Sequence, residues 1–191
     1  MQRIHQLSNQ VTGQQRLISA LNTKSPDDVV IVAAYRTPMQ RARKGEFRQT
    51  PPELLLKAVL QGLVEKTGVD KTLIEDMVVG NCLQPGAGAL VARAAQIMAG
   101  LPIESSAVAV NRQCSSGIEA CSIIASKIKA GIIDVGIGAG VENMSMYDFN
   151  STVAADKISD DLFEHEIARN ALIPMGLTSE VTCLFFCQPR I

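Results

Sequence analysis

Residues 107–130 have the sequence AVAVNRQCSSGIEACSIIASKIKA, and the expected fold follows from this stretch. The apolar run 107–110 predicts a strand, and the small apolar side chains of 118–130 predict a helix. Cys114 lies in the short turn between them. A strand, a short turn and a helix in this order indicate an α/β unit, with the cysteine at the carboxyl end of a strand.

The position of Cys114 makes it a candidate nucleophile. The first amides of a helix have no acceptor within the helix and carry the positive end of its dipole, so a thiolate there is stabilised. Ser115 and Ser116 suit a first helical turn, and Gly117 permits another group to approach closely. Cys114 can equally be a small buried apolar residue, as cysteines outside disulfides usually are. The chemistry of the residues alone supports these two interpretations of Cys114 equally.

The seven residues 111–117 (NRQCSSG) resemble the nucleophile motif of the degradative thiolases, the 3-ketoacyl-CoA thiolases of fatty-acid β-oxidation. Four further segments resemble thiolase segments in the same order along the chain: 29–38 (VVIVAAYRTP), 80–88 (GNCLQPGAG), 140–145 (GVENMS) and 173–176 (IPMG). Condensing enzymes of the ketoacyl-synthase type also place Ser-Ser after a cysteine, but they lack the preceding Asn-Arg-Gln. Kinship with those enzymes stays open, and it predicts loading from acyl carrier protein.

The resemblance implies a thiolase-like N-terminal α/β domain. We expect a largely parallel five-stranded sheet with helices on both faces, plus part of the loop domain that covers the substrate in thiolases. The domain assignment that follows is a targeting segment at 1–26, the α/β domain at 27–144, a partial loop domain at 145–180 and an atypical tail at 181–191. The 80–88 loop is expected near a dimer interface.

Periodicity places the elements around the Cys114 turn. The apolar run 29–34 predicts a strand buried on both faces, and 77–79 and 132–139 predict two more strands. Residues 50–53 (TPPE) predict a capping box with proline at the first helical position. A helix follows with an apolar face and a C-cap glycine: Leu56, Val59, Leu60, Leu63 and Gly68. A second helix is predicted at 89–99. The helix after Cys114 is apolar almost all round, which predicts burial between layers.

Composition excludes several classes of function. The 191 residues are 47% hydrophobic with a net charge of −1, which gives no basic surface for nucleic acid. No apolar run approaches the ~20 residues that span a bilayer. The five cysteines lack the spacing of metal ligands, so we expect no metal and a reducing compartment. The 80–88 loop lacks the Lys-Ser/Thr ending of a phosphate cradle, so we expect no bound nucleotide cofactor. The thiolase resemblance implies that coenzyme A is a substrate and not a cofactor.

The first 26 residues have the composition of a targeting segment. They contain no Asp or Glu, but carry Arg3, Arg16 and Lys24. Arg3-Ile4, followed five residues later by Gln10-Val11, resembles the import signal of peroxisomal thiolases. We therefore expect a peroxisomal import receptor as a partner and the peroxisome as the location, with the mitochondrion second. The alternative is a disordered tail that carries no targeting signal.

Thiolase chemistry needs more than one residue. The resemblance implies that Cys114 attacks a 3-ketoacyl-CoA, and that Met175 lines the acyl pocket, although Met175 can equally be core filler. The base histidine and a second cysteine of thiolases come from a C-terminal half. The two histidines here are His5, in the leader, and His165, which we expect on the surface.

We therefore expect a truncated thiolase that transfers acyl groups to CoA through a cysteine acyl-enzyme and is impaired alone. Residues 181–191 do not resemble a thiolase segment, which agrees with a truncated chain. A homodimer is one expected assembly. A non-catalytic module that pairs with a full-length thiolase subunit is the alternative.

Overall fold

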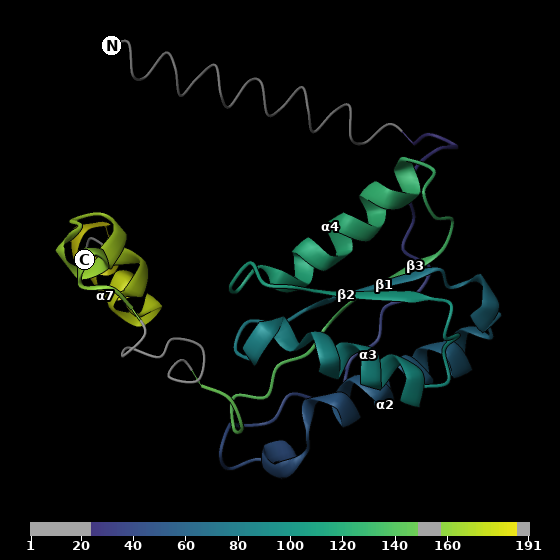
Figure 1. The fold of residues 1–191 in the computed structure, drawn as a ribbon, viewed down its shortest axis with the longest axis horizontal. Helices are drawn as coiled ribbons and strands as arrows, with labels where there is room; N and C mark the ends of the chain where they lie inside the picture. The colour runs from purple at the N-terminus through teal and green to yellow at the C-terminus, as the bar shows by residue number, and fades with distance from the viewer. Residues whose placement is uncertain (1–23, 149–157, 187–191) are drawn as a thin grey trace, which may run out of the picture. The chain divides into compact units, whose positions relative to one another are not determined.

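The computed structural model describes residues 24–148 and 158–186 (Figure 1). The chain divides into two compact units, Met1–Tyr147 and Asp148–Ile191, and each is described by itself. The predicted import signal at 3–11 and the last five residues of the predicted tail lie outside the described residues.

The first unit is organised around a parallel sheet of three described strands. These are β1 (Asp76–Gly80), β2 (Ser106–Val110) and β3 (Gly136–Gly140), in the order β2-β1-β3. Gly80 is in register with Val110 on one side and with Gly140 on the other, so the three carboxyl ends are level. Parallel strands need crossover connections, and each connection here contains a helix.

Helices cover both faces of this sheet (Figure 1). One face packs against α2 (Pro52–Thr67) and α3 (Ala89–Met98), and the other packs against α4 (Ser116–Lys129). The alternation of side chains along β1 produces this division, because Met77 and Val79 join the α2–α3 core while Val78 joins the α4 core. The predicted α/β class with helices on both faces is confirmed.

Helix α2 follows the prediction except at its start. Pro52 is the first helical residue, and Gly68 ends the helix in the left-handed conformation with φ 65°, as predicted. The predicted capping box is wrong, because the N-cap residue is Pro51, one position later than expected, and no side chain caps the helix. The amide of Thr50 instead donates to the Phe47 carbonyl at the end of the 3₁₀ helix η1 (Glu46–Gln49).

The predicted strand at 29–34 is wrong. These residues pair with no strand in the described part of the chain, and Val30, Ile31 and Val32 are 71%, 84% and 87% exposed. A run of β-branched residues favours an extended, buried backbone. A strand also needs a neighbouring strand with which to form hydrogen bonds. The described sheet therefore has three strands where five were expected.

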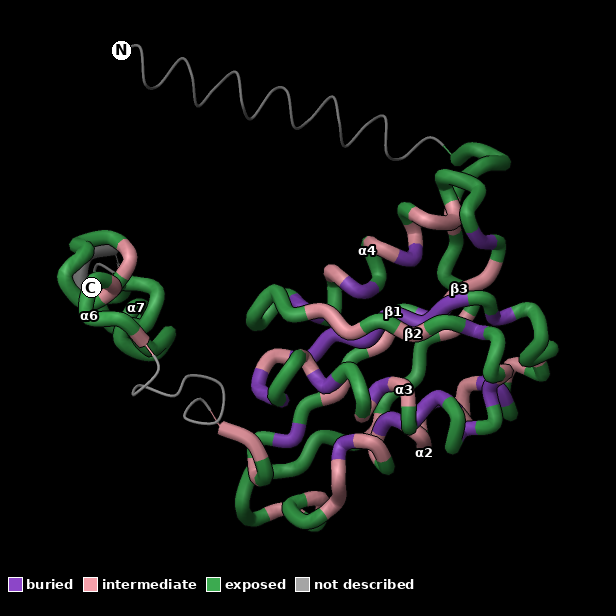
Figure 2. Tube along the Cα trace, in the orientation of Figure 1, coloured by how far each residue is buried: buried purple, intermediate pink, exposed green. Residues whose placement is uncertain are grey.

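Two further predictions need correction at the α4 side of the sheet. The strand predicted at 132–139 begins only at Gly136, because the amides of Asp134 and Val135 bend toward the Glu75 carboxylate, at 2.5 and 3.3 Å. The helix predicted to be buried all round is buried along one face only (Figure 2). Ile118, at its start, is 71% exposed. An apolar composition shows that a helix can be buried, but covering layers decide whether it is.

The remaining elements are short. The 3₁₀ helices η2 (Lys71–Leu73) and η3 (Pro85–Gly88) lie in the connections before β1 and after it. The second unit contains α6 (Asp160–Glu164), the 3₁₀ helix η5 (Ala168–Leu172) and α7 (Met175–Phe186). His165 is exposed at the end of α6, where its Nδ1 accepts from the amides of Ile167 and Ala168. No helix in the described ranges has the length and apolarity to cross a membrane.

Candidate active site

Polar side chains follow all three strands at the carboxyl edge of the sheet. Asn81 comes directly after β1, Asn111 directly after β2, and Glu142 two residues after β3. Because the strands are parallel and end level with one another, these residues gather along one edge. Functional groups in open α/β sheets occur at this edge.

Asn81 ties the three strand ends together. Its amide donates to the Val110 carbonyl at 3.0 Å, at the end of β2. Its side-chain Nδ2 donates to the Val141 carbonyl at 2.5 Å and to Glu142 Oε1 at 3.1 Å, just beyond β3. Its Oδ1 accepts from the Gln84 amide at 2.7 Å. One buried asparagine therefore fixes the relative positions of both loops that flank the Cys114 turn.

Cys114 lies in the turn between β2 and α4, where the sequence places it, and it is exposed. Gln113 before it is left-handed, with φ 51°, a conformation that costs free energy in a residue other than glycine. The buried Ser116 secures this turn, since its Oγ accepts from the Arg112 amide at 2.9 Å and donates to the Gln113 carbonyl at 2.6 Å. The hydroxyl thus stabilises the turn and does not cap the helix.

The N-terminus of α4 approaches the end of β1 very closely. A Cβ atom on Gly80 would lie 2.4 Å from the backbone carbon and oxygen of Ser116, so glycine is required here. A Cβ on Gly117 would meet nothing within 4 Å. The start of α4 is therefore crowded at Ser116, on the side of β1, and open at Gly117.

Arg112 and Glu119 stiffen the exposed side of the same turn. The guanidinium Nε lies 2.9 Å from one carboxylate oxygen of Glu119, and a second guanidinium nitrogen lies 2.9 Å from the other. This two-point geometry connects the turn to the first turn of α4. Because Arg112 is largely exposed, the pair contributes only about 0–1 kcal/mol to stability.

Cys82 lies in the loop that contacts the Cys114 turn. Its carbonyl accepts from Asn111 Nδ2 at 2.9 Å, and its Sγ donates to Gln113 Oε1 at 3.5 Å. Its amide donates to Glu142 Oε2 at 2.9 Å. Burial raises the pKa of the Cys82 thiol, and the nearby Glu142 carboxylate and Cys114 raise the pKa further.

The two predicted site residues belong to different units. Cys114 is in the first unit, and Met175 is the first residue of α7 in the second unit, where it is 63% exposed. The catalytic role of Cys114 and the substrate-binding role of Met175 stay predictions.

Sequence reasoning did not single out four residues that surround Cys114 or support its turn: Asn81, Cys82, Asn111 and Glu142. A usable signal was present, because each of these residues lies within three positions of the end of a predicted strand. Parallel strands that end level with one another bring such residues to one edge of the sheet.

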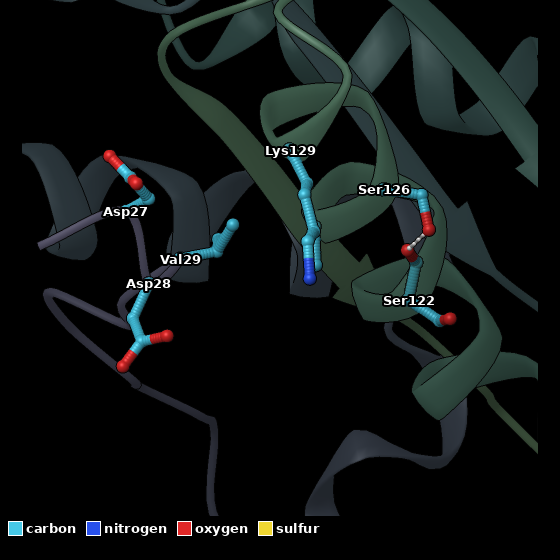
Figure 3. Close-up of a pocket in the computed structure, with 7 residues that line it drawn as sticks. Asp27, Asp28, Val29, Ser122, Ser126 and Lys129 are labelled. Atoms are coloured by element: carbon cyan, nitrogen blue, oxygen red, sulfur yellow. Dashed lines mark hydrogen bonds between the residues drawn. The ribbon is translucent and has the colours of Figure 1, made fainter. Parts of the chain in front are cut away.

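A shallow pocket of about 240 Å³ lies elsewhere in the first unit, between α4 and the extended residues 27–29. Figure 3 shows Lys129 projecting into it, across from Asp27 and Asp28. Its lining comes from the C-terminal half of α4, whereas Cys114 precedes the N-terminus of that helix. This pocket is therefore separate from the Cys114 turn. Among the described residues, no three or more His, Cys, Asp or Glu side chains gather as a metal site would require.

The fold and the turn define a class of protein: a parallel α/β domain that presents a cysteine thiol at the carboxyl edge of its sheet, at the start of a helix. Residues 29–187 match the N-terminal domain of thiolases, and the chain belongs to the thiolase family. The match extends past residue 180, into the segment predicted as an atypical tail.

Named relatives are similar over most of the chain. The peroxisomal 3-ketoacyl-CoA thiolase of Yarrowia lipolytica is 46% identical over 182 residues, which is 94% of this chain and 43% of the relative. Peroxisomal 3-ketoacyl-CoA thiolase B of Rattus norvegicus is 46% identical over 156 residues, which is 82% of this chain and 36% of the relative. The chain thus spans less than half the length of these relatives.

Solved structures support the same family assignment. The dimeric peroxisomal thiolase of Saccharomyces cerevisiae superposes with a TM-score of 0.80 at 40% identity, covering 88% of this chain and 44% of that one. A second structure of the peroxisomal 3-ketoacyl-CoA thiolase of the same yeast has a TM-score of 0.71 at 40% identity, covering 83% of this chain and 44% of that one. That enzyme is described as five layers, A-B-A-B-A, with two core domains of identical topology.

Proposed function

We propose that this chain is the nucleophile-bearing half of a peroxisomal 3-ketoacyl-CoA thiolase, with Cys114 as the residue that takes the acyl group. The observation that carries the proposal is the placement of Cys114: an exposed thiol in the turn between β2 and α4, at the carboxyl edge of the sheet. Identity of 40–46% with peroxisomal thiolases supports the same assignment.

The reaction would proceed in two acyl transfers at Cys114. The thiolate attacks the 3-keto carbon of the substrate, the bond between C2 and C3 breaks, and the acyl group remains on sulfur as a thioester. The departing C2 takes a proton and leaves as acetyl-CoA. The thiolate of a second coenzyme A then attacks the thioester and releases Cys114.

The described part of the first unit offers no histidine as a proton acceptor for Cys114. The sequence has no histidine between residues 24 and 147, since its two histidines are His5 and His165. The family resemblance implies that the base histidine and a proton-shuttling cysteine belong to a second, C-terminal half. We infer that activity requires this half, supplied in a longer polypeptide or by a partner chain.

The test is thiolysis of acetoacetyl-CoA and of a longer 3-ketoacyl-CoA by the isolated chain. Loss of the activating partner lowers the rate by about 10²–10⁴ relative to a full-length relative, and added C-terminal half from that relative should restore activity. Cys114→Ser should abolish acyl-enzyme formation detected by mass spectrometry. Cys121→Ser is the matched control, because Cys121 is also an exposed thiol, on α4.

Two outcomes would contradict this function. Thiolysis by the isolated chain at the rate of a full-length relative would show that the second half is not required. An acyl group found on Cys121, with Cys114 unmodified, would remove Cys114 as the nucleophile.

Met175 is proposed to line the acyl pocket of the assembled enzyme. Replacing it with alanine in the complemented enzyme should change the preference between short and long 3-ketoacyl-CoA substrates. Leu177→Ala is the matched control, because Leu177 is exposed to a similar extent in the same helix. Equal effects of both variants would contradict a specific role of Met175.

Pairing with another thiolase chain is proposed on two grounds. The similar yeast enzyme is dimeric, which supports a homodimer in the peroxisome. The outward face of α4 also exposes Ile118, and 30–32 are exposed as well, so apolar surface is available for a partner. The second candidate function, a non-catalytic module on a full-length subunit, uses the same surfaces. Co-purification with full-length thiolase without restored turnover would favour it over the first.

A further inference from the structure

Two cysteines lie in adjoining segments at the carboxyl edge of the sheet, and the proposed reaction uses only one of them. The Cys82 loop is fastened to the Cys114 turn through both its main chain and its side chain. Asn111 Nδ2 donates to the Cys82 carbonyl at 2.9 Å, and the Cys82 Sγ donates to the side chain of Gln113, the residue before Cys114. The Cys82 sulfur therefore already contacts the residue next to the nucleophile.

The two thiols differ in exposure. Cys114 is exposed and lies at the start of a helix, whereas Cys82 is half-buried. An accessible thiolate is the first to react with a peroxide, and a protected neighbouring thiol is suited to react second.

Gln113 is the side chain that a disulfide would displace. It is exposed, and its side chain contacts this loop through the 3.5 Å hydrogen bond that the Cys82 sulfur donates to Gln113 Oε1. Such a long sulfur contact is weak, so moving the Gln113 amide into solvent costs little.

We propose that Cys82 is the resolving cysteine for Cys114: it forms a reversible disulfide with Cys114 after hydrogen peroxide has oxidised the nucleophile. The disulfide blocks acyl transfer and shields Cys114 from irreversible oxidation. This inference rests on the proposed function, since it takes Cys114 as the reactive thiolate.

Both steps balance in atoms and electrons. The Cys114 thiolate attacks one oxygen of hydrogen peroxide, the O–O bond breaks, and hydroxide leaves, so that Cys114 becomes a sulfenic acid. The Cys82 thiolate then attacks the Cys114 sulfur, the S–O bond breaks, and a second hydroxide leaves. The two thiol protons convert the two hydroxides to water. Two thiols and one peroxide thus give one disulfide and two waters, and a dithiol reductant reverses the change.

The experiment treats the full 191-residue chain with one equivalent of hydrogen peroxide, blocks the remaining thiols with N-ethylmaleimide and maps the peptides by mass spectrometry. We expect a linked peptide that contains Cys82 and Cys114, which dithiothreitol separates. Cys114 found as sulfinic acid beside a maleimide-blocked Cys82 would overturn the inference. A disulfide between Cys114 and Cys121 would overturn it as well.

Variants at the resolving position sharpen the result. In Cys82→Ser and Cys82→Val, dimedone-trapped sulfenic acid on Cys114 should increase about tenfold, because nothing resolves it. Cys121→Ser should behave as the unmodified chain does. Unchanged trapping in both Cys82 variants would overturn the inference, whichever of the two folds better.

A parallel alkylation with iodoacetamide at pH 7, without peroxide, separates this inference from the proposed function. Faster labelling of Cys114 than of Cys121, combined with no linked peptide, would overturn the resolving role alone. Labelling of Cys114 no faster than Cys121 would overturn the reactive nucleophile, and with it the inference.

Discussion

The two faces of the sheet are packed in different ways. On the face covered by α2 and α3, eleven buried apolar side chains form one cluster, which includes Leu56, Leu60 and Met77. On the α4 face the cluster has four: Val78, Ala120, Ile124 and Ile133. The first face is a filled hydrophobic core, whereas the second depends on close approach between helix and sheet.

Glycines in β3 explain the difference. A Cβ on Gly136 would lie 2.9 Å from Ile124, and a Cβ on Gly138 would lie 2.8 Å from the Cα of Cys121. On this side β3 therefore offers no side chains to pack, and α4 rests almost directly on the strand. The gain is a helix N-terminus placed tightly against the sheet edge, with Cys114 in the turn before it. As a consequence, α4 buries little apolar area against the sheet, and its outer face is exposed to solvent.

The largest expected effect is on the α2–α3 face. Leu60→Ala should lower the free energy of unfolding by about 2–5 kcal/mol, because Leu60 is almost fully buried in a filled core and its loss leaves a cavity. Ile124→Ala, on the α4 face, should cost about half as much, since the neighbouring exposed helix surface can relax. Urea unfolding of both variants measures the difference. Equal losses would show that the two faces are packed equally well.

The second effect acts where α4 meets β1. Gly80→Ala should lower the free energy of unfolding by about 1–3 kcal/mol, because its Cβ would overlap the Ser116 backbone, which can move only if the whole start of α4 moves. The same shift should slow alkylation of Cys114 if that turn activates it. Gly117→Ala is the matched control, since its Cβ meets nothing within 4 Å. If the two variants unfold at the same urea concentration, the close approach of the Ser116 backbone to Gly80 does not limit the packing of α4 against β1.

Local patterns in the sequence predicted most of this architecture. The apolar spacing around Leu56 and Leu60 placed α2, and Gly68 placed its end, because both signals come from neighbouring residues. The position of Cys114 between a strand and a helix followed from the same kind of local signal. The contacts around it did not, because the pairing of Asn81 with residues near 141 joins segments about 60 positions apart.

Long-range partners also explain the failures. The run 29–34 has the composition of a buried strand, but composition does not say whether a partner edge exists. The helix that became α4 is apolar enough to be buried all round, yet among the described residues the sheet is the one layer of structure packed against it. Both errors overestimate burial in a chain that spans less than half of its relatives, so both mark surfaces that further polypeptide could cover.

The third effect tests the polar contact that fastens α4 to the sheet. Lys127, near the end of α4, pairs with the buried Asp76 at the start of β1, and Ser106 Oγ donates to the same carboxylate at 2.6 Å. Burial raises the pKa of Asp76, but the Lys127 hydrogen bond, the Ser106 hydrogen bond and the Lys127 charge outweigh it, so the pKa is lowered overall.

A carboxylate whose pKa is lowered by folding stabilises the protein above its unfolded pKa, about 4, and this contribution is lost as the pH falls through the lower folded value. Lys127→Met should therefore cost about 1–2 kcal/mol at pH 7, allowing for the partial exposure of Lys127, and the difference should disappear in acid. Urea unfolding at a series of pH values measures it. Lys129→Met is the control, because Lys129 is exposed at the end of α4. A loss that stays constant with pH would mean that Lys127 acts through packing alone.

The smallest effect is a gain of stability on the α2–α3 side. Gly62 lies inside α2, and a Cβ there would meet nothing within 4 Å. Gly62→Ala should raise the free energy of unfolding by about 0.5–1 kcal/mol, because alanine loses less conformational freedom in a helix than glycine does. Because α2 packs on a filled core, that gain should appear in global urea unfolding. Gly117→Ala adds the same methyl group near the start of α4, so a larger gain there would show that α4, and not α2, limits the stability of the sheet.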